Sequence, residues 1–290
     1  MKYIVRERNS SKNIIMHSNK MLNFLYNNIF GRIILKVFIT KFIANTSRLY
    51  LNSKLSKIRI KRFINNNKID MNLYENRNYN SFNEFFIRKI KLNNRPINKN
   101  KNIFISPCDS KLTVYNITKD LEINIKDSYY SINTLVDKDI INDYIDGLLL
   151  VFRLDTTDYH RYCYIDDGSQ NNNNYINGIL HTVQPISLSH YNFYKTNSRC
   201  YTVLHTNNFS DVIDVEIGAL MIGKIVNEHE NNSFKKGEEK GHFEFGGSTI
   251  CLIIKKDIVD IDKDIIENSK LNIETIVKYG EKIGSKKCIK

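Results

Sequence analysis

Two adjacent glycines and a serine form the pattern in this chain with the clearest chemical meaning. Gly246, Gly247, Ser248 and Thr249 stand directly before the apolar residues 250–254. In a chain with only 12 glycines, an adjacent pair indicates a backbone that needs unusual torsion angles or a close approach. A serine placed there resembles a self-cleavage site, with its hydroxyl as a nucleophile at the start of a buried strand. The tetrapeptide alone is also typical of an ordinary tight turn, so its surroundings decide.

The elements that must position this serine are helical first and strand-rich afterwards. Residues 14–66 are predicted to be helical, because apolar residues recur at spacings of three and four. Ser81 followed by Glu84 is a capping-box pattern that opens another short helix. From Ile103 onward, short apolar or alternating runs predict strands, among them residues 148–154, 212–217 and 249–254. The sequence therefore predicts an α+β fold with a mainly antiparallel, β-rich domain after N-terminal helices.

Length and cysteine usage narrow the class of protein. The chain has 290 residues, enough for one large domain or two modest ones. Its five cysteines are odd in number and lack any C-x-x-C spacing, which argues against a zinc site or a secreted disulfide framework. They are Cys108, Cys163, Cys200, Cys251 and Cys288. We expect a reducing, cytoplasmic setting and no metal ion.

Positive charge is concentrated at the N-terminus. Residues 1–66 contain fourteen Lys or Arg against one acid, Glu7. The net charge of this segment, +13, exceeds the +12 of the whole chain. Such a segment is typical either of a nucleic-acid-binding arm or of a surface for anionic lipid.

The apolar residues between these cations favour lipid. Within residues 20–44, Asn28, Arg32, Lys36 and Thr40 recur every four positions and predict one polar stripe on an otherwise apolar helix. Such a helix can lie in a membrane interface, but its charges leave no window long enough to span a bilayer. Packing of the apolar face on the chain's own core stays an alternative. Nucleic acid is disfavoured, because no stacking platform or recognition motif accompanies the cations.

Five further segments precede the glycine pair in a recognisable order. They are residues 82–89 with Arg95-Pro96-Ile97, Ser106-Pro107-Cys108-Asp109, Asp158-Tyr159-His160-Arg161-Tyr162-Cys163, 215–223 and 236–243. Taken together they resemble phosphatidylserine decarboxylase, and are most similar to the compact bacterial form with a Gly-Gly-Ser-Thr processing motif. The resemblance extends from about residue 20 to Ser285 and covers nearly the whole chain.

The resemblance implies that the chain is a proenzyme that cleaves itself between Gly247 and Ser248. The products would be a β chain, residues 1–247, and an α chain, residues 248–290. A serine hydroxyl is a weak nucleophile until a base removes its proton, and glycines let it bend back on the preceding carbonyl. Elimination of the resulting ester leaves dehydroalanine, which hydrolyses to a pyruvoyl group at position 248.

That pyruvoyl group is the covalent cofactor that the resemblance implies. Its carbonyl would form a Schiff base with the amine of phosphatidylserine and act as the electron sink for loss of carbon dioxide. The product, phosphatidylethanolamine, places the carboxy-lyase in phospholipid biosynthesis. We expect residues 1–66 to attach the catalytic domain, residues 67–290, peripherally to anionic phospholipid on the cytoplasmic face of the cell membrane. Whether the processed chains form a homodimer stays open.

Two site residues follow from the same resemblance. Asp109 matches the aspartate of a Ser-Pro-x-Asp motif, the orienting carboxylate of a Ser-His-Asp relay. His160 matches the first histidine of an Asp-Tyr-His-Arg-x-His motif and handles protons during decarboxylation. Without the resemblance, Asp109 would be interpreted as a turn-capping residue and His160 as a partly buried structural histidine.

Cys163 is the main departure from the family pattern. It occupies the position of the second histidine of that motif, the base of the self-cleavage relay. A thiol has an unperturbed pKa of about 8.5. Imidazole can accept a proton at one nitrogen while a hydrogen bond at the other orients the ring, whereas a thiol has only its sulfur atom for both roles. Three hypotheses follow: His160 substitutes as base, Cys163 acts as a thiolate, or processing is slow or lost. The last includes a relative that binds anionic lipid without catalysis.

Overall fold

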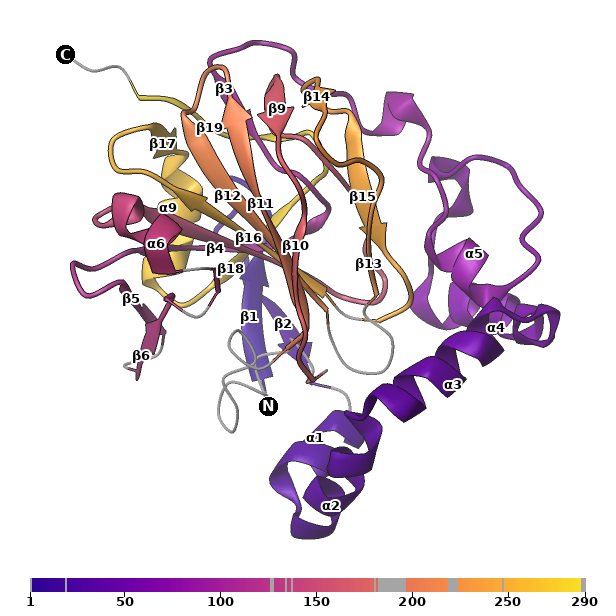
Figure 1. The fold of residues 1–290 in the computed structure, drawn as a ribbon. Coiled ribbons are helices and arrows are strands. Elements are labelled where there is room, and N and C mark those ends of the chain that lie inside the picture. Colours follow the sequence, from indigo (N-terminus) through magenta and orange to yellow (C-terminus); the bar gives the residue numbers. More distant parts are fainter. Residues whose placement is uncertain are drawn as a thin grey trace.

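The central sheet is built from the predicted apolar runs. The computed structural model of this chain describes residues 2–18, 20–125, 128–133, 135–136, 138–179, 181, 197–218, 224–246 and 248–287. Its largest sheet has the strand order β14-β9-β11-β12-β16-β7-β4-β18-β1-β2, with β10 paired to β11. Neighbours are antiparallel except β1 and β18. This confirms the α+β fold and the mainly antiparallel sheet (Figure 1).

The helices are α1 Lys20–Asn27, α2 Ile29–Phe38, α3 Lys41–Asn52, α4 Ile58–Asn67, α5 Phe82–Phe86, α6 Lys138–Ile141 and α9 Lys263–Lys270. The strands are β1 Lys2–Arg6, β2 Ile14–His17, β3 Ile103–Ile105, β4 Ser110–Asn116, β5 Glu122–Ile125, β6 Ser128–Ser131, β7 Leu148–Leu154, β8 Arg161–Cys163, β9 Gly168–Gln170, β10 Asn174–Ile176, β11 Arg199–Thr206, β12 Asp211–Gly218, β13 Ile225–Asn227, β14 Ser233–Phe234, β15 Glu239–Phe243, β16 Ser248–Ile254, β17 Val259–Ile261, β18 Glu274–Val277 and β19 Lys282–Lys286. Short 3₁₀ helices cover Lys54–Lys57, Met71–Leu73, Leu92–Asn94 and Asn142–Tyr144.

The middle strands of the sheet are buried on both faces. All seven residues of β16 are buried. Alternate residues point to opposite sides of a strand, so Ile250 and Leu252 join one hydrophobic cluster, whereas Cys251 and Ile253 join another. Burial on both sides explains why this strand is a continuous apolar run in the sequence. It also fixes Ser248, the first residue of β16, inside the molecule.

The predicted helical region differs from expectation at its start. Residues 14–17 form strand β2, which pairs antiparallel with β1, and β1 in turn pairs parallel with β18. Four residues are too few to distinguish a helical from a strand period. Strands β1 and β2 therefore extend the sheet, and the predicted helical region begins only at α1, from which α1 to α4 lead away from the sheet (Figure 1).

The prediction of a single amphipathic helix within residues 20–44 is wrong, because the segment is divided among α1, α2 and the start of α3. Asn28 is the N-cap of α2, and its side chain accepts hydrogen bonds from the backbone of Phe30 and Gly31. Thr40 caps α3 in the same way. Side-chain oxygens at these two positions satisfy helix-end N–H groups, so they mark helix boundaries instead of a stripe. Within the described residues, no helix is both long and apolar enough to cross a bilayer.

The predicted start of α5 at the Ser81 cap is confirmed, but the return bond of the capping box goes to the residue before the cap. The Ser81 hydroxyl accepts from the backbone N–H of Glu84 at 3.1 Å, and the Glu84 carboxylate accepts from that of Asn80 at 2.7 Å. Helix α5 packs its phenylalanines against α3, α4 and Phe245. The helical region thereby contacts the segment that precedes Ser248.

Candidate active site

Ser248 and His160 are brought together at the predicted cleavage position. Ser248 pairs with Leu154 at the end of β7, and His160 directly precedes β8. The Ser248 Oγ lies 3.4 Å from His160 Nδ1, and both side chains are buried. A serine beside an imidazole nitrogen is the pairing that general-base activation of a hydroxyl requires.

The second ring nitrogen sets the tautomer of His160. Its Nε2 lies 3.0 Å from the backbone carbonyl oxygen of Asp155. Because a carbonyl can only accept, Nε2 carries the proton and Nδ1 keeps the lone pair that faces Ser248. The orienting group is thus a backbone carbonyl, where the family resemblance implies a carboxylate.

A charged turn holds that carbonyl in place. The Asp158 N–H also donates to the Asp155 carbonyl at 2.9 Å, while the Asp158 carboxylate accepts from the Asp155 N–H at 2.7 Å. The Lys111 ammonium contacts the carboxylate of Asp158 at 2.6 Å and that of Asp155 at 3.1 Å. Burial opposes ionisation of Asp155, but the charges of Arg153 and Lys111 keep its pKa below the usual value. The turn is therefore a closed network of ion pairs and hydrogen bonds beside His160.

His160 is neutral in this environment. Its ring packs on that of Phe86, with centroids 4.2 Å apart. Burial lowers the pKa of His160 from 6.5 to about 3, because a charged imidazolium loses its hydration there. The neutral form, which can accept the Ser248 proton, is populated throughout the physiological pH range.

The lowered pKa predicts a pH-dependent stability. The unfolded chain protonates His160 below about pH 6.5, whereas the folded chain does so only near pH 3. The stabilisation is present above the unfolded pKa and is lost as the pH falls toward the folded one. We expect the free energy of unfolding of the Ser248→Ala chain to fall between about pH 7.5 and about pH 5, and by less once His160→Gln is added. Urea unfolding at both pH values measures this; equal losses in the two chains would contradict it.

Asp109 lies apart from this pair. Its carboxylate forms a two-pronged ion pair with Arg95, at 2.9 Å from Nε and 2.6 Å from Nη2, and accepts from the Tyr279 N–H at 2.8 Å. Within the described residues, its hydrogen bonds and ion pairs go to Arg95, Lys278 and Tyr279. The relay role of Asp109 stays a prediction. In this geometry its carboxylate is one half of a buried ion pair with Arg95.

Cys163 also points elsewhere. It belongs to a core cluster with Phe104, Leu112 and Ile283, and burial raises the pKa of its thiol to about 12. Cys163 lies three positions after His160, an odd spacing that in extended chain places the two side chains on opposite sides of the backbone. The structure therefore favours the hypothesis that His160 substitutes as base.

The backbone before Ser248 is held by α5. The Phe245 N–H donates to the Asn83 side chain at 3.0 Å, and the ring centroids of Phe245 and Phe86 are 5.0 Å apart. Gly246 has a φ of 150°, a conformation that favours glycine. Gly247 lies outside the described residues, as do residues 219–223 of the predicted 215–223 segment and Cys288.

One group of potential metal ligands occurs within the described part of the chain. Glu228, Glu239 and His242 place ligand atoms within 4.8 Å of one another. Glu239 is ion-paired with Arg161, and His242 with Glu228 at 3.2 Å. A cation would have to displace Arg161, so these residues carry no argument for a metal centre.

Comparison with known proteins places this site in context. A family model described as phosphatidylserine decarboxylase matches residues 82–285. A phosphatidylserine decarboxylase proenzyme 2 from Clostridium acetobutylicum is 50% identical over 270 residues, which is 92% of each chain. A phosphatidylserine decarboxylase proenzyme from Clostridium tetani is 42% identical over 296 residues, the full length of both.

Proposed function

The chain belongs to the phosphatidylserine decarboxylase family, and we propose that it matures by cleaving itself before Ser248 with His160 as the base. The relatives are named as proenzymes, which fits a precursor that must be processed. The observation that supports the assignment of residues is the contact between Ser248 Oγ and His160 Nδ1 at 3.4 Å. The alternative, a lipid-binding relative without catalysis, has no support from the comparisons.

The self-cleavage chemistry follows from this pair. The Ser248 oxygen adds to the carbonyl carbon of residue 247 while its proton passes to His160 Nδ1. The peptide C–N bond breaks, and its nitrogen takes up a proton to become the free amine of residue 248, leaving an ester. Loss of the Cα proton then expels the carboxylate of residue 247 and leaves dehydroalanine. Addition of water and release of ammonia complete the pyruvoyl group.

The buried position of Ser248 fits such a group. Its side chain is fully enclosed and lies against an imidazole that can hold or return a proton. A pyruvoyl carbonyl at this position supplies the electron sink for loss of carbon dioxide from an amine-bearing substrate. Phe86 and Phe245 pack beside the site and limit the access of water, while His160 remains positioned for proton transfer.

The function is tested by product formation. The purified chain should release carbon dioxide from phosphatidylserine and form phosphatidylethanolamine, and the Ser248→Ala chain should do neither. Equal activity of the two chains would exclude a group made from Ser248. A cleaved chain that releases no carbon dioxide from phosphatidylserine would contradict the proposed decarboxylation.

The surface of the N-terminal helices supports attachment to lipid. Most of the large apolar side chains that are exposed among the described residues lie on or between α1 and α4, each at least 42% exposed. They are Met21, Phe24, Ile29, Phe30, Ile33, Ile34, Val37, Phe42, Leu49, Tyr50, Leu55 and Ile58. A gathered apolar surface among lysines and arginines is typical of a helix that binds an anionic membrane. The proposed site of action is the cytoplasmic face of the cell membrane.

Vesicle binding tests this surface. Phe30, Ile33 and Val37 share the exposed side of α2, and the triple change to serine should weaken binding to phosphatidylglycerol-containing vesicles by about 100-fold or more. The fold should be retained, because these side chains are already in water. Changing the exposed Leu92 and Leu271 to serine is the matched control and should leave binding unchanged. Unchanged binding of the triple variant would contradict the proposed surface.

A further inference from the structure

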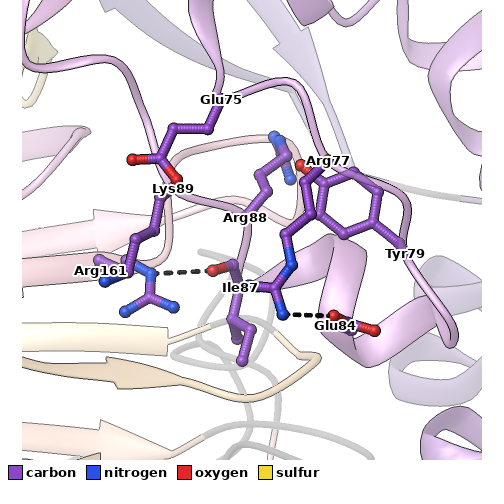
Figure 2. A pocket seen from close by; sticks show the side chains of 8 residues that line it. All are labelled: Glu75, Arg77, Tyr79, Glu84, Ile87, Arg88, Lys89 and Arg161. Carbon is purple, nitrogen blue, oxygen red and sulfur yellow. Dashed lines mark hydrogen bonds and ion pairs between the residues drawn. The ribbon is translucent and has the colours of Figure 1, made fainter.

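A small pocket lies beside α5, next to the site described above. Its volume is about 120 Å³, below the range of about 300 to 1,000 Å³ typical of pockets for whole small-molecule ligands. The charged side chains that line it are Arg77, Arg88, Lys89 and Arg161 against Glu75 and Glu84 (Figure 2). The pocket has room for one small group and an excess of positive charge.

Two of these cations already have partners. Arg77 is paired with Glu84 at 2.8 Å, and both are shown joined in Figure 2. Arg161 is paired with Glu239 and donates to the Ile87 carbonyl at 2.8 Å. Each of these two cations therefore already has a carboxylate partner in the chain.

Arg88 differs from them. It is 2% exposed and lies between the rings of Tyr74 and Phe85, at 4.3 Å and 4.8 Å. Its terminal nitrogens donate to the Phe86 carbonyl at 3.4 Å and to the Tyr74 hydroxyl at 3.1 Å, and both of these acceptors are uncharged. Within the described residues no carboxylate lies within 4.0 Å of its guanidinium, and its buried Nε has no hydrogen-bond acceptor. Removing a cation from water without a counter-ion is unfavourable. The fold thus keeps a positive charge that lacks its anion.

Tyr79 supplies a second unused donor to the same pocket. The residue is 8% exposed, and its buried hydroxyl has no hydrogen-bond partner. Buried polar groups are nearly always paired, so two unpaired donors in one cationic pocket point to a ligand. A small anion that accepts from Tyr79 Oη and Arg88 Nε would satisfy both.

We propose that this pocket binds the phosphate of the lipid substrate's headgroup, an assignment that rests on the proposed function. Arg161 follows His160 in the chain, Phe86 packs on the His160 ring, and the charge of Arg88 contributes to lowering the pKa of His160. The pocket is therefore a neighbour of the reacting centre. It also adjoins α5, which packs on α3 and α4, the side from which lipid is expected. A headgroup phosphodiester is close to the amine that reacts, and it matches the pocket in size and charge.

Tyr79→Phe tests the assignment with little disturbance. Removing a hydroxyl that has no partner should leave the melting temperature and self-cleavage unchanged. Losing a hydrogen bond to an anion should raise KM for short-chain phosphatidylserine about 10-fold, with kcat nearly constant. Tyr144→Phe, at a buried tyrosine whose hydroxyl donates to the Asp211 carbonyl instead, is the control and should leave KM unchanged. An unchanged KM in an active, cleaved Tyr79→Phe chain would overturn the proposal.

Direct binding separates this proposal from the function on which it rests. Short-chain phosphatidylglycerol lacks the amine, and it should bind the uncleaved Ser248→Ala chain about 10-fold more weakly once Tyr79→Phe is added. Equal affinities would overturn the proposal whether or not the wild-type chain is active. Inorganic phosphate is the second ligand. If Tyr79→Phe weakens phosphate binding alone, the pocket holds a free anion and the lipid assignment is wrong.

Discussion

Replacing His160 by glutamine should slow cleavage before Ser248 by about 100-fold or more, because a positioned general base contributes about 10²- to 10⁴-fold. Glutamine is neutral and can still donate to the Asp155 carbonyl. Its amide nitrogen cannot take up the Ser248 proton as Nδ1 of His160 does. The measurement is the rate at which the 34.0 kDa chain disappears on a denaturing gel after synthesis.

Cys163→Ala is the matched control for that experiment. The thiol is buried in the core and its pKa is raised to about 12, so its removal should leave the cleavage rate close to that of the wild-type chain. Ser248→Ala should give only the intact chain. If His160→Gln cleaves normally and Cys163→Ala does not, the base is Cys163 and the assignment of His160 is wrong.

The Asp109→Asn chain should lose about 3 to 5 kcal/mol of unfolding free energy, the range typical of breaking a buried ion pair from one side. Asparagine leaves the guanidinium of Arg95 without the carboxylate that it contacts at 2.6 Å and 2.9 Å. Urea unfolding at neutral pH in the Ser248→Ala background measures the loss. At low temperature, where the variant is still folded, self-cleavage with Ser248 intact should proceed at nearly the normal rate.

The same variant distinguishes the structure from the family pattern. If Asp109→Asn keeps its stability but stops cleavage, Asp109 belongs to the relay as the resemblance implies. Asp257→Asn, which breaks an exposed ion pair with Lys287, is the control and should have little effect on either measurement.

The strands were the most predictable part of the fold. The apolar runs at 148–154, 212–217 and 249–254 correspond to β7, β12 and β16 within one residue, because burial on both faces leaves a continuous apolar signal. The helical region is broken at Asn28 and Thr40, whose side chains cap the helices that follow them. Such side-chain hydrogen bonds compete with continuation of the helix, and the repeat of apolar residues does not reveal them. The parallel pairing of β1 with β18 joins the two ends of the chain, and no local pattern predicts such a contact.

The site was predictable only where side-chain chemistry leaves a motif. Ser248 and His160 belong to recognisable patterns, and the structure brings them together. The Asp155 carbonyl that orients His160 is a backbone group and leaves no trace in the residue types. Likewise, Arg88 looks like any other cation until its surroundings show that it lacks a carboxylate.

The central claim is that Ser248 becomes a pyruvoyl group through cleavage of the chain before it. Mass spectrometry of the small fragment after denaturation tests it most directly. The account predicts residues 248–290 with a mass lower, by one ammonia, than that of the same peptide beginning with serine. An intact chain of 290 residues, or a fragment that begins with an unmodified serine, would contradict it.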